Sequence, residues 1–202
     1  MGILCLNGRT ISFGRYTNRK VLLEGFFVSV TTTREVFCGV ISQGVAPYFF
    51  MKICSFFGHR SIENSATLYE KAYNSILKAI ELGCRIFYFG GFGEFDSLCY
   101  EIVSKIKNEA NEFEITRTFC VPQERDLRRK SRLFNPESYE NVIYLSPSFD
   151  GWYKSIYFRN CAMIDKSDVV IFYAENRENS GAYKAYKYAK TKKDKILFNL
   201  YE

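Results

Sequence analysis

The chain contains 202 residues, of which 47% are hydrophobic and 25% are charged, and it has only 13 glycines and 4 prolines. This composition excludes collagen-like, low-complexity and wholly disordered proteins. The length suits one compact domain, or one domain with an appendage. The formal net charge of +6 is modest, so it gives no argument for nucleic acid, and we do not expect nucleic acid as a partner.

The cysteine and histidine content limits the chemistry. The seven cysteines show no C-x-x-C spacing and several lie in apolar runs, as in reduced cytosolic proteins, so we expect a cytoplasmic protein. The one histidine, His59, excludes a His-rich metal site, and we expect neither a metal nor a cofactor. Because the sequence shows no apolar run of about 18 residues and no signal-peptide pattern, we also expect no membrane contact.

Residues 1–50 form a predicted N-terminal extension that lacks the pattern of the rest. Gly, Thr, Ser and aromatic residues alternate irregularly, and the strand-like pieces at 21–30 and 36–41 have no crossover helix. Two interpretations stay open. Either the extension is a genuine irregular or β-rich segment, or translation starts naturally at Met51, directly before the first regular strand. The intact mass of the protein from its native host distinguishes them.

From residue 51 to 202 the sequence predicts one α/β domain. Short apolar segments alternate with amphipathic helical patterns, and they cover 52–57, 85–89, 115–121, 142–145, 168–173 and 195–198. This alternation is typical of a parallel sheet with crossover helices. We therefore expect a Rossmann-like domain of three layers with a mainly parallel sheet.

Each predicted helix has a recognisable start. Thr67 begins a capping box for the first helix,. The second helix follows the turn at 90–94 and repeats apolar residues at i, i+3, i+4 and i+7, which is the clearest amphipathic pattern in the chain. Asp150 would cap the third helix, and Asn179 or Ser180 the fourth,.

Three loops are placed where open α/β sheets bind ligands, beyond the carboxyl ends of the strands. They lie at 58–60, 90–96 and 175–181. In the first of them, a backbone turn at Gly58 with His59 and Arg60 would hold an anionic group. The alternative is a surface arginine beside a hydrogen-bonded histidine.

The glycine turn is the strongest local signal. Gly90, Gly91 and Gly93 let the backbone approach a ligand, and the next helix would offer N–H groups and its positive end to an anion,. We expect a phosphate there, although the turn would also serve as a tight connection. Asp96 would contact a sugar hydroxyl, or it is favoured there by the helix dipole alone.

Two further pairs complete the candidate site. Arg159 and Asn160, in the helix before the fifth strand, would point over the sheet edge. Ser180 and Gly181 repeat the anion-site pattern at the last helix, with plain capping as the alternative. The candidate ligand-binding residues are Gly58, His59, Arg60, Gly90, Gly91, Gly93, Asp96, Arg159, Asn160, Ser180 and Gly181.

These motifs resemble a known family. The runs Cys-Ser-Phe-Phe-Gly-His-Arg ending at Arg60, Gly-Gly-Phe-Gly-Glu-Phe-Asp ending at Asp96, Arg-Asn-Cys-Ala-Met ending at Met163, and Ser-Gly ending at Gly181 are similar to the DUF1273 (YpsA/YoqJ-like) family of the SLOG superfamily. That superfamily also contains the Lonely Guy phosphoribohydrolases and DNA-processing protein A. The resemblance covers about residues 52–200 and implies a Rossmann-like domain that binds nucleotides or nucleotide derivatives.

The chain departs from these relatives in two places. DUF1273 relatives usually have Gly-Gly-Ala-x-Gly-x-Asp at the second loop, whereas here Gly93 is the third glycine and an acid follows it. The Lonely Guy enzymes have Gly-Gly-x-Gly-Thr-x-Glu at the last turn, where this chain has Lys184 in place of the acid. Cleavage of an N-glycosidic bond needs a carboxylate, so hydrolysis would depend on Asp96 or Glu175 instead.

We therefore expect a cytoplasmic, sensor-like protein that binds a nucleotide or nucleotide-like small molecule. The alternative is an N-glycosidic hydrolase (phosphoribohydrolase) that acts on nucleoside monophosphates. A third class, single-stranded DNA binding, would depend on Arg128, Arg129 and Lys130,. The many aromatic residues also allow a homo-oligomer.

Overall fold

The computed structural model describes residues 51–63, 65–109, 114–128, 138–145, 151–177 and 180–201, and four strands within the first 50 residues. Its contacts divide the chain into two units, 1–50 and 51–202. In the first unit, β1 (Gly2–Leu6) pairs antiparallel with β2 (Arg9–Phe13), and β3 (Lys20–Leu23) with β4 (Phe26–Ser29). The predicted piece 21–30 contains β4 and all but the first residue of β3, whereas 36–41 lies outside the described residues.

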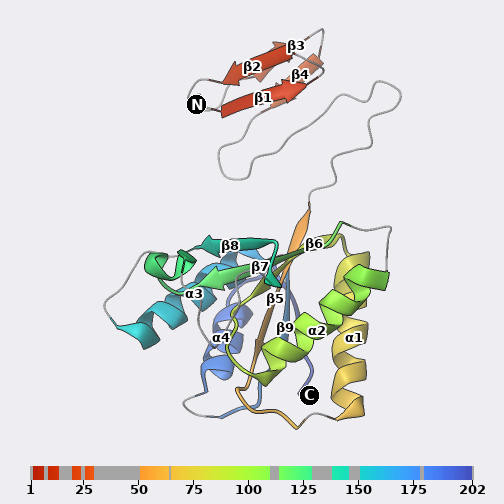
Figure 1. Cartoon of the computed structure of the whole chain (residues 1–202), viewed down its shortest axis with the longest axis vertical. Helices are drawn as coiled ribbons and strands as arrows, with labels where there is room; N and C mark the ends of the chain where they lie inside the picture. Colours follow the sequence, from red (N-terminus) through yellow and green to blue (C-terminus); the bar gives the residue numbers. More distant parts are fainter. Residues whose placement is uncertain are drawn as a thin grey trace. The chain divides into compact units, whose positions relative to one another are not determined.

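The second unit is built on a parallel sheet, as predicted (Figure 1). All strand pairs in it are parallel, and their order is β10-β9-β5-β6-β7-β8. Most residues of β5, β6 and β9 are buried or half-buried, and strands covered on both faces appear in a sequence as apolar runs. The strands are β5 (Lys52–Gly58), β6 (Cys84–Phe89), β7 (Thr116–Val121), β8 (Asn141–Tyr144), β9 (Val169–Tyr173) and β10 (Ile196–Asn199).

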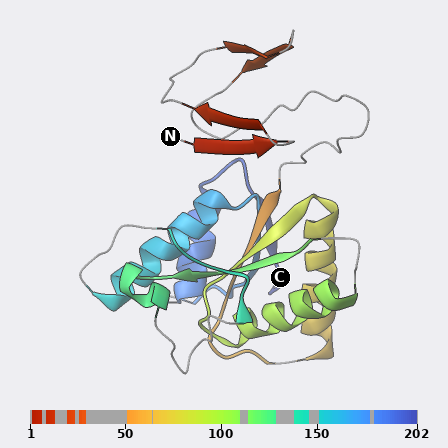
Figure 2. The same ribbon diagram turned by 45° about the horizontal axis from the view of Figure 1, so that its top comes forward.

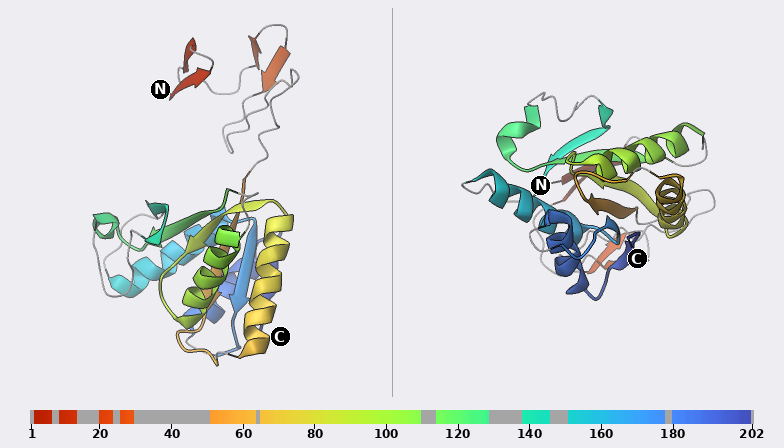
Figure 3. Two further views of the ribbon diagram at one scale, coloured as in Figure 1. Left: turned by 45° about the vertical axis from the view of Figure 1, so that its right-hand side comes forward. Right: turned by 90° about the horizontal axis from the view of Figure 1, so that it is seen from below.

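Helices cover both faces of this sheet, which confirms the three-layer Rossmann-like fold (Figures 2 and 3). Side chains of α1 (Ala66–Glu81) and α2 (Glu94–Glu109) form one hydrophobic cluster, and those of α3 (Trp152–Lys166) and α4 (Gly181–Lys190) form another. Successive strand residues alternate between the two clusters: Phe56 packs in the first and Phe57 in the second,. No helix in the described part of the chain is long and apolar enough to cross a bilayer.

The helix starts agree with the sequence only in part. Ser180 caps α4 as predicted, because its Oγ accepts a hydrogen bond from the Tyr183 N–H. The cap of α1 is Ser65 rather than Thr67, two residues earlier. The cap of α3 is Gly151, which has no side chain to accept a bond, and Asp150 lies outside the described residues.

The strand order creates a switch point between β5 and β9. From β5 the chain adds β6, β7 and β8 on one side, and it then returns to the other side to add β9 and β10. The loops after β5 and β9 therefore leave the sheet in opposite directions, and a crevice opens between them. This crevice is where the sequence places two of its candidate loops.

Candidate functional site

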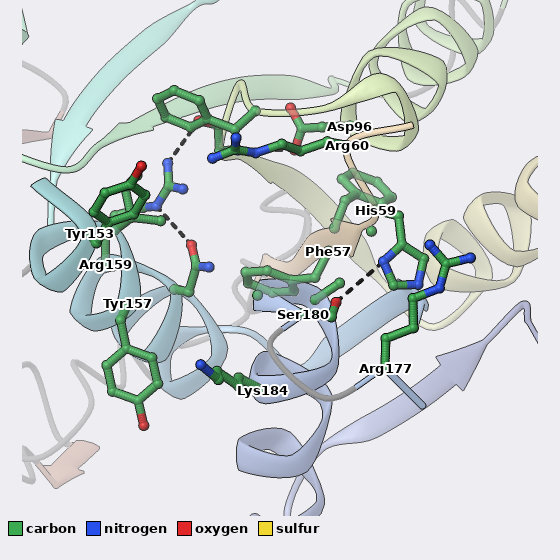
Figure 4. A pocket seen from close by; sticks show the side chains of 18 of the residues that line it. Phe57, His59, Arg60, Asp96, Tyr153, Tyr157, Arg159, Arg177, Ser180 and Lys184 are labelled. Carbon is green, nitrogen blue, oxygen red and sulfur yellow. Dashed lines mark hydrogen bonds between the residues drawn. The ribbon is translucent and has the colours of Figure 1, made fainter. Parts of the chain in front are cut away.

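A cavity of about 1110 Å³ occupies this switch point (Figure 4). It is bordered by the end of β5, the turn after β6, one side of α3 and the start of α4. The structure brings nine of the eleven predicted residues to this cavity and leaves Gly91 and Gly93 outside its lining. The nine are Gly58, His59, Arg60, Gly90, Asp96, Arg159, Asn160, Ser180 and Gly181.

The glycine turn is closed by its own carboxylate. The N–H groups of Gly90 and Gly91 donate to Asp96 Oδ1 and Oδ2, at 3.1 and 2.8 Å. Asp96 is 6% exposed, and burial raises its pKa to about 6, although the two backbone hydrogen bonds and Arg159 favour the charged form,. These two amides, expected to hold a phosphate, therefore hold the carboxylate of Asp96 instead.

Close packing explains why two glycines stand in this turn. Gly91 has a φ of +71°, and a Cβ there would lie 2.3 Å from Cε2 of Phe119. Gly93 has a φ of +113°, and its Cβ would lie 3.0 Å from the backbone of Arg60. Because L-residues rarely adopt such angles, glycine is required at both positions by conformation and by space.

Arg159 is a buried cation at the wall of the cavity. It is 2% exposed, and its Nη1 donates to the carbonyl oxygens of Gly90 and Cys120 at 2.7 and 2.9 Å, while Nε donates to Asn160 Oδ1. Its guanidinium also lies over the ring of Phe92, 5.4 Å from the centroid,. Burial lowers its pKa, but an arginine keeps its charge in proteins.

The second terminal nitrogen of this guanidinium, Nη2, belongs to a residue that lines the cavity. Nη2 of Arg159 has no hydrogen-bond partner among the described residues. A charged donor that reaches the cavity without a partner favours an anion there.

His59 joins the two loops that flank the switch point. Its Nε2 accepts a hydrogen bond from the Glu175 N–H at 2.9 Å, and its Nδ1 lies 3.3 Å from Ser180 Oγ. Burial and the charge of Arg177 lower the pKa of His59, and Glu175 opposes that shift,. The ring is therefore neutral near pH 7 and works as a hydrogen-bonded link.

The charges around the cavity are one-sided. Its described lining contains five basic residues and one carboxylate, that of Asp96. Arg177, which lines the cavity, forms an ion pair with Glu175, which does not. Arg60 and Lys184 form no ion pair with any of the described residues. The basic residues are Arg60, Lys154, Arg159, Arg177 and Lys184.

Sequence reasoning missed the aromatic part of the lining. Phe56, Phe57 and Phe92 line the cavity. Tyr153 and Tyr157, also in the lining, project from α3 (Figure 4). Tyr153, Tyr157 and the predicted Asn160 follow at i, i+4 and i+7, which places them on one face of α3. That spacing was the available signal. Aromatic faces of this kind stack on nucleobases.

The described residues give less support to metal binding and to hydrolysis. No three His, Cys, Asp or Glu side chains among them gather where they could hold a metal ion. The two carboxylates considered for hydrolysis are both engaged, since Asp96 accepts from the glycine turn and Glu175 pairs with Arg177. The side chain of Arg128, and all of Arg129 and Lys130, lie outside the described residues.

Two solved structures are similar to this chain. The X-ray structure of DNA processing protein A from Streptococcus pneumoniae matches with a TM-score of 0.51 and 14% identity, over 74% of this chain and 50% of that one. DNA processing protein A from Helicobacter pylori, studied for its single-stranded DNA binding mode, matches with a TM-score of 0.49 and 15% identity, over 72% and 64%. No protein-family model and no curated protein matches the chain.

The expectation that nucleic acid is not a partner was wrong. It is contradicted by the comparison, because the Streptococcus pneumoniae structure that shares the fold is a DNA processing protein. The error has a physical reason. A net charge of +6 averages over the whole surface, whereas a polyanion responds to local clusters of cations such as the one at this cavity.

The likeness extends to the fold and no further at this level of identity. The chain spans half the length of the Streptococcus pneumoniae protein. Membership of the DUF1273 family stays a prediction. The chain shares a fold with part of DNA processing protein A, and membership of the SLOG superfamily also stays a prediction.

Proposed function

We propose that this chain binds a nucleotide or nucleotide derivative in the cavity between β5 and β9, as a cytoplasmic, sensor-like member of the DUF1273 branch of the SLOG superfamily. One observation carries the proposal. The described lining combines five basic residues with five aromatic residues, and its single carboxylate is hydrogen-bonded to the protein itself.

The two halves of a nucleotide match these two kinds of residue. Phosphate would contact Arg159 Nη2, Arg60 and Lys184, with the start of α4 contributing its dipole,. The base would stack on Tyr153 or Tyr157,. At about 1110 Å³ the cavity is at the upper end of small-molecule sites, which occupy roughly 300–1,000 Å³.

Calorimetric titration of the full chain with AMP tests this proposal. Lys184→Glu reverses a charge in the lining, and we expect it to weaken binding by about tenfold or more. Lys105→Glu is the matched control, because Lys105 is exposed on α2, away from the lining. No heat with AMP, ADP or a dinucleotide, or equal weakening by both variants, would contradict the proposal.

Hydrolysis of the ligand is the alternative within the same cavity. Incubation with AMP followed by chromatography for free adenine distinguishes the two. We expect no adenine, because neither Asp96 nor Glu175 has an unengaged carboxylate,. Adenine release that disappears in Asp96→Ala would establish the hydrolase instead.

A second candidate function is single-stranded DNA binding, which the fold of DNA processing protein A and the composition of α4 both favour. The ten residues of α4 contain three lysines and no acid. Lys184 lines the cavity, and Lys187 and Lys190 follow at i+3 and i+6 on exposed positions. The outer face of α4 therefore continues the positive charge of the cavity along the surface.

Fluorescence anisotropy with a labelled oligothymidylate tests this second function. Lys187→Glu with Lys190→Glu should weaken binding and lower the slope of log K against log salt by about 0.7 for each lost phosphate contact. The control combines Lys78→Glu with Lys105→Glu, two exposed lysines on α1 and α2. Absence of binding at low salt, or equal effects of both double variants, would dismiss it.

A further inference from the structure

His59 contacts both sides of the switch point. Its ring extends from the loop after β5 and reaches the loop after β9, 116 residues along the chain, through the N–H of Glu175. On its other side it reaches Ser180, the residue that caps α4. The ring of Tyr173 stands edge-on to it, with centroids 6.1 Å apart.

These contacts determine which nitrogen of the His59 ring carries the hydrogen. A backbone N–H can only donate, so Nε2 must accept from Glu175 and carry no hydrogen,. The neutral ring then has its hydrogen on Nδ1, from which it donates to Ser180 Oγ at 3.3 Å,. Ser180 Oγ already accepts from the Tyr183 N–H, so its own hydrogen remains to be donated.

We propose that His59 is a positioning residue: its neutral ring holds the start of α4 against the cavity, and protonation of the ring releases that link and weakens ligand binding. A proton on Nε2 would face the Glu175 N–H, so that two donors meet where a hydrogen bond stood,. The loop from 174 to 180 would then lose its tie to β5. Ser180, Gly181 and Lys184 would lose their fixed place in the lining. This proposal rests on the proposed function, because it concerns affinity at the same cavity.

Several charged and titratable groups face this ring. Arg177 and Glu175 come from the loop after β9, with opposite effects on the ring, and Tyr173 comes from β9. Arg60 is next to His59 in the chain and lines the same cavity. From α2, Asp96 also lines the cavity, and because its pKa is raised to about 6 it titrates in the same pH range.

Comparison of the wild type with His59→Gln isolates the effect of protonating the His59 ring. The glutamine amide oxygen can accept from the Glu175 N–H at the place of Nε2, but it does not titrate. Titrations with AMP from pH 7.5 to 5.5 then differ only through His59, since Asp96 and the phosphate of AMP titrate in both proteins. We expect the affinity of the wild type to fall at least fivefold more than that of the variant.

A rise of affinity on acidification would have a different cause. A protonated His59 that contacted the phosphate directly would make the affinity of the wild type rise on acidification relative to His59→Gln. That result would overturn the positioning role, and so would superimposable pH profiles. His59→Ala removes the link at every pH, so we expect weak binding in it that the glutamine variant largely restores.

Hydrogen exchange gives a readout that needs no ligand. The protection factor of the Glu175 amide, corrected for the intrinsic rate, should fall with acidification in the wild type and stay level in His59→Gln. Equal profiles would overturn the proposal. If neither AMP, ADP nor a dinucleotide binds at any pH, the proposed function fails, while this measurement still decides whether His59 links the two loops. If His59→Gln does not fold, NMR titration of the wild type replaces it: the His59 ring and the Glu175 amide must share one midpoint, and different midpoints would overturn the proposal.

Discussion

Arg159 Nη1 donates a hydrogen bond of 2.7 Å to the carbonyl oxygen of Gly90, 69 residues away in the chain. The same nitrogen reaches the carbonyl oxygen of Cys120 at 2.9 Å, so one guanidinium ties α3 to the ends of β6 and β7. The fit is close, since a Cβ at Gly90 would lie 3.0 Å from Nη2, and the guanidinium would have to shift by a few tenths of an ångström to admit it. The wall of the cavity is therefore built around a buried cation.

Removal of this guanidinium should destabilise the fold as well as the site. Arg159→Met keeps much of the apolar stem but leaves the Gly90 and Cys120 carbonyls without their donor, and buried acceptors left in this way cost about 1–3 kcal/mol each. We expect the free energy of unfolding, measured with urea, to fall by about 2–4 kcal/mol. Lys105→Met on the exposed side of α2 is the control. A loss below about 0.5 kcal/mol for Arg159→Met would show that these hydrogen bonds contribute little.

Three glycine-to-alanine changes distinguish the cost of a positive φ from the cost of a steric clash. In Gly91→Ala the angle and the clash with Phe119 act together, so we expect a loss of about 2–4 kcal/mol in unfolding free energy. Gly151 has a φ of +99° and nothing within 4 Å, so its loss should be about 1 kcal/mol. Gly181 has neither constraint, and Gly181→Ala should be neutral or slightly stabilising. Equal losses at all three would contradict this order.

The layers of the fold could be predicted because their signals are local. The stripe on α2 follows from spacing alone, and every member of it is buried in the structure, as are the central residues of β9. Ser180 could be predicted as a cap because its hydroxyl acts three residues along the chain. At α1 the choice between two hydroxyl residues, Ser65 and Thr67, depends on how the chain enters the helix, and spacing does not define that.

The interior of the site could not be predicted in the same way. The sequence locates the glycine turn and Asp96 correctly, but the carboxylate turns back onto Gly90 and Gly91 rather than toward a ligand. That direction depends on packing against other elements. His59 likewise finds its partners more than 100 residues away, where no local pattern can indicate them.

The ion pairs of Glu140, the residue before β8, should stabilise the fold less at low pH. Its carboxylate pairs with Arg117 at 2.6 Å and with Lys107 at 2.8 Å. Burial raises the pKa of Glu140, but these hydrogen bonds outweigh it and lower the pKa to about 2. A lowered pKa gives stability above the unfolded value of about 4.5 that is lost as pH falls toward 2,.

Glu140→Gln tests this pair. With allowance for solvent screening at a one-third exposed group, we expect the variant to lose about 1–2 kcal/mol of unfolding free energy at pH 7. The difference from the wild type should shrink between pH 4.5 and 2. Glu109→Gln, at an exposed position on α2, is the control. A difference that stays constant with pH would show that charge is not its origin.

Asp96 should have the opposite pH dependence, because burial raises its pKa from 3.8 to about 6. A group whose pKa is higher in the folded state stabilises it most below the unfolded pKa, and the contribution is lost as pH rises through the folded value. A shift of this size corresponds to about 3 kcal/mol. Asp96→Asn does not titrate. Most of this contribution is still present at pH 4, so the unfolding free energy of the wild type minus that of the variant should decrease by roughly 2 kcal/mol between pH 4 and pH 7.

Denaturant unfolding across that pH range measures this difference, and the contributions of His59 and Glu140 cancel because both proteins contain them. The absolute stability of the variant does not enter the argument. Asparagine offers one acceptor oxygen where the carboxylate offers two to Gly90 and Gly91,, but it does not titrate, so the variant adds no pH dependence at this position. An increasing difference with pH would mean that the two loop hydrogen bonds outweigh burial. Asp96 would then be a charged anchor of the glycine turn with a lowered pKa.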